Sequence, residues 1–177
     1  MEEKKTSVAA NALNYGLITG AVIIVYNLLL YIANLYMNQA LGWVAYLFLV
    51  GGMVWGTLEY RKKLEGGFLT YGQAFSSCFF IGMIAGILAI IYMFFYVKYI
   101  NPGIVNEIME QSRQKLQEKN LTEDQIEAGL EWTRKFTTPG IMTVFGLIAY
   151  AFFSALLGLI ASIFLKKVDP NAPTSAL

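Results

Sequence analysis

The sequence contains no histidine and a single cysteine, Cys78, in 177 residues. The lack of histidine excludes imidazole acid–base catalysis and imidazole metal ligands, and one cysteine cannot form an intrachain disulfide bond. Charge is scarce: Asp, Glu, Lys and Arg make up 14% of the chain, against about 25% in soluble domains. The 13 basic and 12 acidic residues give a net charge of +1, so no basic field favours nucleic acid. We therefore expect no metal, no cofactor and no nucleic-acid partner.

Apolar residues are abundant and gather in long runs. They make up 56% of the chain, and the mean hydropathy is +0.52. Runs of about 18 to 25 residues without Asp, Glu, Lys or Arg are long enough for a hydrocarbon core of roughly 30 Å. Only helices or closed barrels satisfy their backbone groups in lipid, and the alternation of a barrel is missing. The sequence predicts an all-α integral membrane protein, a single membrane domain over 1–177, with four transmembrane helices at residues 13–36, 41–58, 74–96 and 141–165.

Basic residues flank three of the predicted spans and indicate an orientation. They stand before the first span and after the second and fourth, at residues 4–5, 61–63 and 166–167. The link at residues 37–40 carries no charge, whereas residues 98–138 hold six dispersed basic residues. Because compact basic clusters near span ends stay in the cytoplasm, we expect both termini to be cytoplasmic.

The segment 101–138 between the third and fourth spans is too polar to span a membrane. It predicts an extracytoplasmic hairpin of two short helices. Asn101 followed by Pro102 is typical of a helix start, and Asn120 of a stop. Thr122 and Gln125 have the spacing of a capping box for the second helix. The hairpin either only joins the spans and shields their outer ends, or serves as a docking or gating cap.

Three polar residues of the first span, Asn27, Tyr31 and Asn34, have the spacing of one helical face. Buried amides in lipid need hydrogen-bond partners. This face either bonds to groups of other helices, such as Ser77, Tyr150 or Ser154, or lines a small polar path.

Small residues recur at intervals of four in each span. Such residues let helix backbones approach closely, either within one chain or in a dimer. The candidate helix-packing positions are Gly16, Gly20, Gly82, Gly86 and Gly158.

From residue 66 onward, four segments follow one another in a fixed order: residues 67–75 entering the third span, 96–102 leaving it, 122–126 in the hairpin, and 158–162 before the last basic pair. In this order they resemble a bacterial membrane family known as domain of unknown function 4199. One departure is Leu157, where family members often carry proline. The resemblance implies a bacterial inner-membrane location and four spans, and it transfers no catalytic or binding residue.

No set of residues for catalysis is visible. An intramembrane hydrolase needs a nucleophile with a base in reach, but no span contains Asp or His, and Glu59 is isolated. We expect a non-catalytic structural or interaction subunit that assembles with itself or another membrane protein, through helix packing and the outer hairpin. The alternative is a small channel or permease for a neutral solute, acting as a homo-oligomer through the face of Asn27, Tyr31 and Asn34.

Overall fold

The structure is a computed structural model that describes residues 7–168 and Pro170. The predicted basic pair at residues 4–5 lies outside the described residues. Within them the chain is helical, with six α-helices and no β-strand. In order these are α1 (Val8–Ile32), α2 (Gln39–Lys62), α3 (Tyr71–Phe95), α4 (Ile104–Gln117), α5 (Glu123–Phe136) and α6 (Pro139–Leu165).

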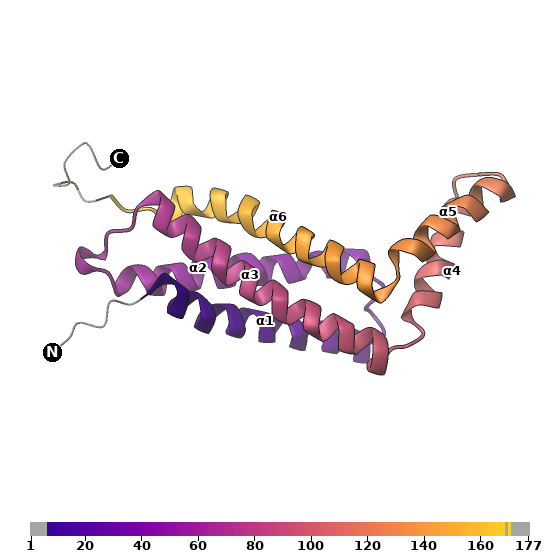
Figure 1. The fold of residues 1–177 in the computed structure, drawn as a ribbon, viewed down its shortest axis with the longest axis horizontal. Coiled ribbons are helices and arrows are strands. Elements are labelled where there is room, and N and C mark those ends of the chain that lie inside the picture. The colour runs from indigo at the N-terminus through magenta and orange to yellow at the C-terminus, as the bar shows by residue number, and fades with distance from the viewer. Residues whose placement is uncertain (1–6, 169, 171–177) are drawn as a thin grey trace. The chain divides into compact units, whose positions relative to one another are not determined.

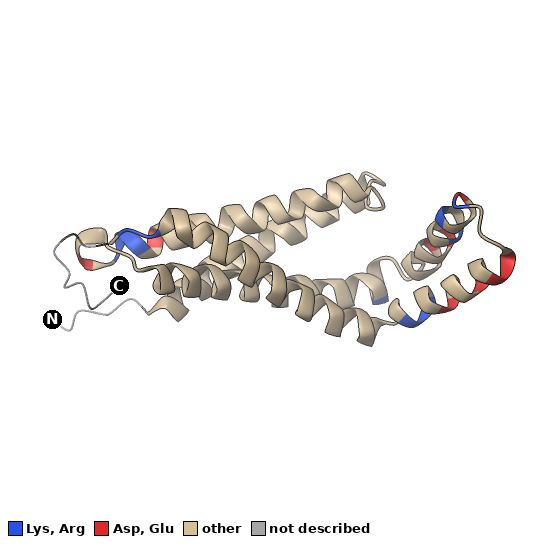
Figure 2. Cartoon of the chain, turned by 90° about the horizontal axis from the view of Figure 1, so that it is seen from above, with Lys and Arg blue, Asp and Glu red and all other residues tan. Residues whose placement is uncertain are grey.

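Four helical segments among the described residues are long and apolar enough to cross a membrane, in agreement with the four predicted spans. In each segment, between 17% and 39% of the most apolar 18-residue stretch is buried inside the protein. Large apolar side chains therefore cover the outside of these segments, as a lipid-facing surface requires. Figure 2 shows the helices of the spans almost free of charged residues, which gather at the end of α2 and along α4 and α5. The segments are Val8–Ile32, Gln39–Lys62, Tyr71–Ile100 and Pro139–Leu165.

The chain divides into two compact units, and α3 and α6 each contribute to both. The first unit comprises the described parts of Met1–Ala89 and Ala149–Leu177, and the second is Ile90–Ile148. In the first unit α1 and α2 lie side by side (Figure 1). Its core is formed by apolar and small side chains that include Ala12, Leu49, Met53, Cys78, Ile81 and Ala85.

The first helix is shorter at its C-terminus than the predicted span. It ends at Ile32, and Asn34 takes the left-handed conformation with φ 56°. The N–H groups of Asn34 and Leu35 donate to the carbonyls of Tyr31 and Leu30, at 3.0 and 2.8 Å. This is a Schellman motif, and Asn is one of the few residues that accept the left-handed position. The local turn thus stops the helix although the apolar pattern continues.

In the second unit α4 and α5 are consecutive helices that contact each other. A π-helical turn, Tyr96–Ile100, extends α3, and the N–H of Asn101 donates to the carbonyl of Tyr96 at 2.8 Å. The predicted helix start, with Asn101 as the cap and Pro102 as the first helical residue, is wrong, because Asn101 closes this π turn and α4 begins only at Ile104. Ile126 of α5 is buried, and the side chain of Leu116 on α4 packs at Gly129.

The predicted capping box of α5 is confirmed. The N–H of Thr122 donates to the side-chain oxygen of Gln125 at 3.1 Å, and the Thr122 side chain accepts from the backbone of Gln125. Two backbone donors at the start of α5 are thereby satisfied.

Candidate functional site

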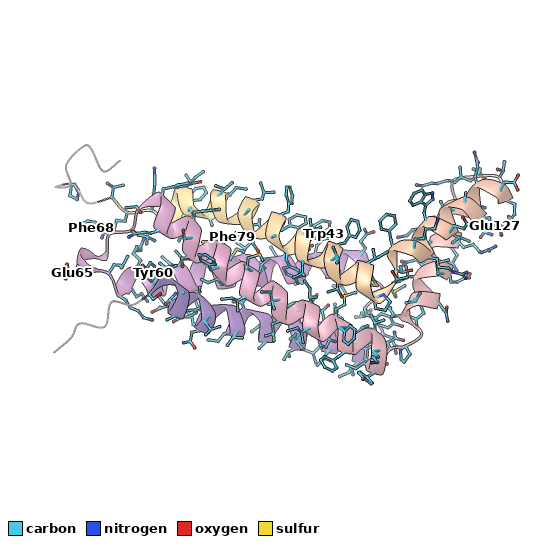
Figure 3. The ribbon with its side chains drawn as sticks, viewed as in Figure 1. Trp43, Tyr60, Glu65, Phe68, Phe79 and Glu127 are labelled. Atoms are coloured by element: carbon cyan, nitrogen blue, oxygen red, sulfur yellow. The ribbon has the colours of Figure 1, made fainter. Side chains whose placement is uncertain are left out.

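The connection between α2 and α3 is tied to the end of α6. Gly66 and Gly67 form the turn with φ of 65° and 63°, a conformation that glycine adopts without strain. Leu69 and Lys167 then exchange two backbone hydrogen bonds, each of 2.8 Å. The ammonium of Lys167 lies 5.5 Å from the centre of the Phe68 ring, and Figure 3 labels Phe68 at this end of the unit. We call these residues, Gly66–Leu69 with Lys167, the end clip.

Two further interactions hold the same end of the first unit. The guanidinium of Arg61, in the last turn of α2, donates to the carbonyl of Leu165 at 3.3 Å. The N–H of Thr70 donates to Gln73 at 3.0 Å, and the N–H of Gln73 donates to the Thr70 hydroxyl at 3.3 Å. This second capping box satisfies donors at the start of α3. The start of α3 and the ends of α2 and α6 are therefore held together.

A buried hydroxyl cluster connects α2 with α3. The hydroxyl of Thr57 donates to that of Ser77 at 2.9 Å and lies 3.3 Å from the sulfur of Cys78. All three side chains are fully buried, as are Ser154 and Ser162 of α6. Ser162 donates to the carbonyl of Gly158 in its own helix at 2.6 Å. Hydroxyl groups inside an apolar bundle are costly unless they are bonded, so the Thr57–Ser77 pair fixes the register of two helices.

Asn11 makes the second buried polar connection. Its amide nitrogen donates to the carbonyl of Gly56 at 2.8 Å, and its amide oxygen accepts from the ammonium of Lys63 at 3.2 Å. The side chain is 2% exposed. Asn11 therefore joins the first turns of α1 to the end of α2. Neither Asn11 nor Thr57 was singled out from the sequence, because no local pattern distinguishes them from other polar residues near the ends of spans.

The predicted polar face of α1 does not form as one helical face. Asn27 donates to the carbonyl of Ile23 in its own helix at 2.8 Å. The ring of Tyr31 lies 5.5 Å from that of Tyr36. Asn34 is exposed and lies beyond the last helical residue, so it is not part of the helix to which Asn27 and Tyr31 belong. The cause is the Schellman motif that ends α1 at Ile32.

The glycines singled out for helix packing face side chains of the same chain. A Cβ atom at Gly16 would lie 2.7 Å from the Cβ of Ile84, and one at Gly20 would lie 2.9 Å from Leu88. A Cβ atom at Gly82 would meet the side chain of Ser154, and one at Gly86 would meet that of Tyr150. A Cβ atom at Gly158 would lie 3.4 Å from Cys78, which is an ordinary contact. Four of these five positions therefore lie at helix contacts too close for a Cβ atom.

A shallow groove lies between α4 and α5 in the second unit. Its volume is about 220 Å³, and it is lined by Asn106, Met109, Glu110, Arg113, Leu130 and Arg134. Arg113 forms an exposed ion pair of 3.4 Å with Glu123. The groove is polar and carries charges of both signs.

The family model described as Protein of unknown function (DUF4199) matches residues 14–167. The chain belongs to this family. Neither a curated protein nor a solved structure matches the chain. The DUF4199 match is longer than the resemblance noted from residue 66 onward, and it includes α2 and most of α1. It covers the hydroxyl cluster and the hairpin, and it ends at Lys167, the residue that pairs with Leu69.

Proposed function

We propose that this DUF4199 protein is a non-catalytic membrane subunit that assembles with another membrane protein through its α4–α5 hairpin. The groove between α4 and α5 carries the proposal, because Arg113 and Arg134 line it beside the buried side chain of Leu130. Interfaces of this kind place charged groups around a less polar centre.

The helices of the first unit use polar groups and glycine positions for contacts within the chain, which a partner would otherwise bind. The amides of Asn11 and Asn27 and the hydroxyl of Thr57 bond within the chain. The glycine positions at Gly16 and Gly82 are filled by neighbouring side chains. A partner that used these small-residue faces would first have to displace the chain's own packing, whereas the hairpin groove is open.

The proposed location is a bacterial inner membrane with both termini in the cytoplasm and the hairpin on the opposite side. The end clip and the bond from Arg61 to the Leu165 carbonyl support this orientation, because together they hold Arg61 of the basic triplet at residues 61–63 and Lys167 at the same end of the first unit. Clusters of basic residues at span ends favour the cytoplasmic side. The dispersed basic residues of the hairpin are accompanied by acidic ones, as Figure 2 shows.

Crosslinking in native membranes tests the proposal. A C-terminally tagged chain would be crosslinked, purified and analysed for mass and composition, beside the variants Arg134→Glu and Lys119→Glu. Both variants make the same charge change on the hairpin, but only Arg134 lines the groove. We expect a foreign membrane protein in constant ratio, lost with Arg134→Glu and kept with Lys119→Glu.

Two other results would contradict the proposal. A bare monomer in all three samples would leave no assembly to explain. A homo-oligomer without a foreign protein would favour the alternative of a small permease, and solute flux through vesicles carrying the Asn27→Leu variant would then be the next measurement.

A further inference from the structure

Three exposed aromatic rings form a continuous row from α5 to the first part of α6. The rings of Trp132 and Phe136 are stacked, with centroids 6.0 Å apart and planes at 20°. The ring of Phe136 meets the edge of Phe145 at 5.3 Å. The exposed fractions of these side chains are 62%, 47% and 54% in the same order. We call Trp132, Phe136 and Phe145 the aromatic row.

The aromatic row lies at the start of the fourth candidate span. Pro139 is the first residue of the fourth candidate span, and only two residues separate it from Phe136. Phe145 lies six residues inside that span, which corresponds to about 9 Å along the helix. Because Phe136 contacts this ring, the last turn of α5 reaches the level of the first turns of the span.

A lysine accompanies the aromatic row. The ammonium of Lys135 lies 5.4 Å from the centre of the Trp132 ring. Aromatic rings and lysines are typical of the membrane–water interface, where the ring enters the apolar boundary and the ammonium reaches the phosphate groups.

A second cluster of aromatic rings with one lysine lies at the end of the third candidate span. The ammonium of Lys98 is 5.7 Å from the centre of the Phe94 ring and 5.3 Å from that of Tyr99. The rings of Phe95 and Tyr99 are stacked at 5.9 Å, and both are more than half exposed. The chain thus carries an aromatic–lysine cluster where it leaves one candidate span and another where it enters the next.

We propose that the aromatic row anchors α5 to the phospholipid surface, with Trp132 and Phe136 in the boundary between headgroups and acyl chains. We expect lipid rather than protein to cover the row, because the row is continuous with the outer surface of α6. Only 17% of the most apolar stretch of α6 is buried inside the protein. The anchor also orients the hairpin, since it holds one side of α5 on the membrane. This inference concerns lipid contact and does not depend on whether the groove binds a partner.

Depth-dependent fluorescence quenching tests the anchor in the full chain. The variant Trp43→Phe/Trp55→Phe leaves Trp132 as the only tryptophan, and both replaced side chains are more than half exposed. The protein would be reconstituted in phosphatidylcholine vesicles. Quenching by lipids brominated near the top of the acyl chain would be compared with quenching by aqueous iodide.

A matched control moves the tryptophan to another face of the same helix. It adds Trp132→Phe and Glu127→Trp to the two replacements above. Glu127 is exposed, lies about 140° around α5 from Trp132 and is labelled in Figure 3. Circular dichroism of both proteins checks that the helices are intact.

The anchor predicts strong quenching of Trp132 by brominated lipid and iodide quenching several-fold weaker than at position 127. Strong iodide quenching of Trp132 with none by brominated lipid would overturn the proposal. Protection of Trp132 from both quenchers would overturn it too, because it would mean that protein covers the row. None of these outcomes depends on a captured partner.

Discussion

Leu69 and Lys167, almost one hundred residues apart, exchange a pair of backbone hydrogen bonds of 2.8 Å. This small antiparallel bridge joins the α2–α3 connection to the end of the last apolar helix. Leu69 is 1% exposed, so the bridge is closed from solvent on the side of its side chain. The bridge requires the sharp turn at Gly66 and Gly67, because this turn directs the chain back toward Lys167.

Gly66→Ala is expected to loosen the end clip. The φ of 65° is unfavourable for alanine, and the new Cβ atom would lie about 2.5 Å from the Phe68 ring. The left-handed conformation alone costs an L-residue roughly 1–2 kcal/mol. Thermal unfolding in detergent should show a lower midpoint. Gly72→Ala is the control, because a Cβ atom there would have no atom of the described residues within 4 Å apart from its chain neighbours and its own helix backbone. An equal loss in both variants would contradict the account.

Gly52→Ala and Gly51→Ala should differ although the two residues are neighbours. A Cβ atom at Gly52 would overlap the side chain of Thr19, whereas one at Gly51 would have no side chain of the described residues beyond its chain neighbours within 4 Å. Overpacking of this kind typically costs about 1–3 kcal/mol. Unfolding in denaturant should place Gly52→Ala well below the parent and Gly51→Ala at or above it. Equal stability of the two variants would show that α1 and α2 do not pack as described.

The hydrogen bond between Thr57 and Ser77 should make the effects of mutating the two residues on the free energy of unfolding non-additive. Thr57→Val and Ser77→Ala each remove one hydroxyl and leave the other without its 2.9 Å partner. Side-chain hydrogen bonds between membrane helices contribute about 0.6 kcal/mol on average and up to about 1.7 kcal/mol. The double variant should therefore lose less stability than the sum of the single losses. Strict additivity would mean that the two hydroxyls act independently.

Asn11 and Asn27 provide a matched pair for the role of amides in α1. Asn11 is buried and joins two helices, whereas Asn27 is only half-buried and bonds to its own helix. Asn11→Ala leaves the Gly56 carbonyl and the Lys63 ammonium without this partner and should cost about 1–3 kcal/mol. Asn27→Ala should change stability by less than about 0.5 kcal/mol. A larger loss for Asn27→Ala would indicate a connection beyond its own helix.

The helical architecture could be predicted from the sequence, because the signals that mark each helix are local. Charge-free runs identify the four spans, and the spacing of Thr122 and Gln125 identifies the start of α5. The boundary errors have local causes as well. Asn34 stops α1 through a Schellman motif, and the π turn after α3 uses Asn101 and delays α4.

The polar connections could not be predicted because they depend on helix arrangement. Thr57 bonds to Ser77, which is 20 residues away in the sequence, and Asn11 bonds to Gly56, which is 45 residues away. Hydropathy patterns show which residues are apolar, but they do not show which helices are neighbours. The lipid-facing aromatic row was missed for the same reason, since Phe136 and Phe145 belong to different helices.

Site-specific photocrosslinking tests the central claim, assembly through the hairpin groove, most directly. A photoreactive amino acid would be placed at Asn106, which lines the groove, or at Lys115, about 180° around α4 from Asn106 and also exposed. Illumination of cells should yield one discrete protein adduct from position 106 and none from position 115. Equal adducts from both positions, or none from position 106, would contradict the claim.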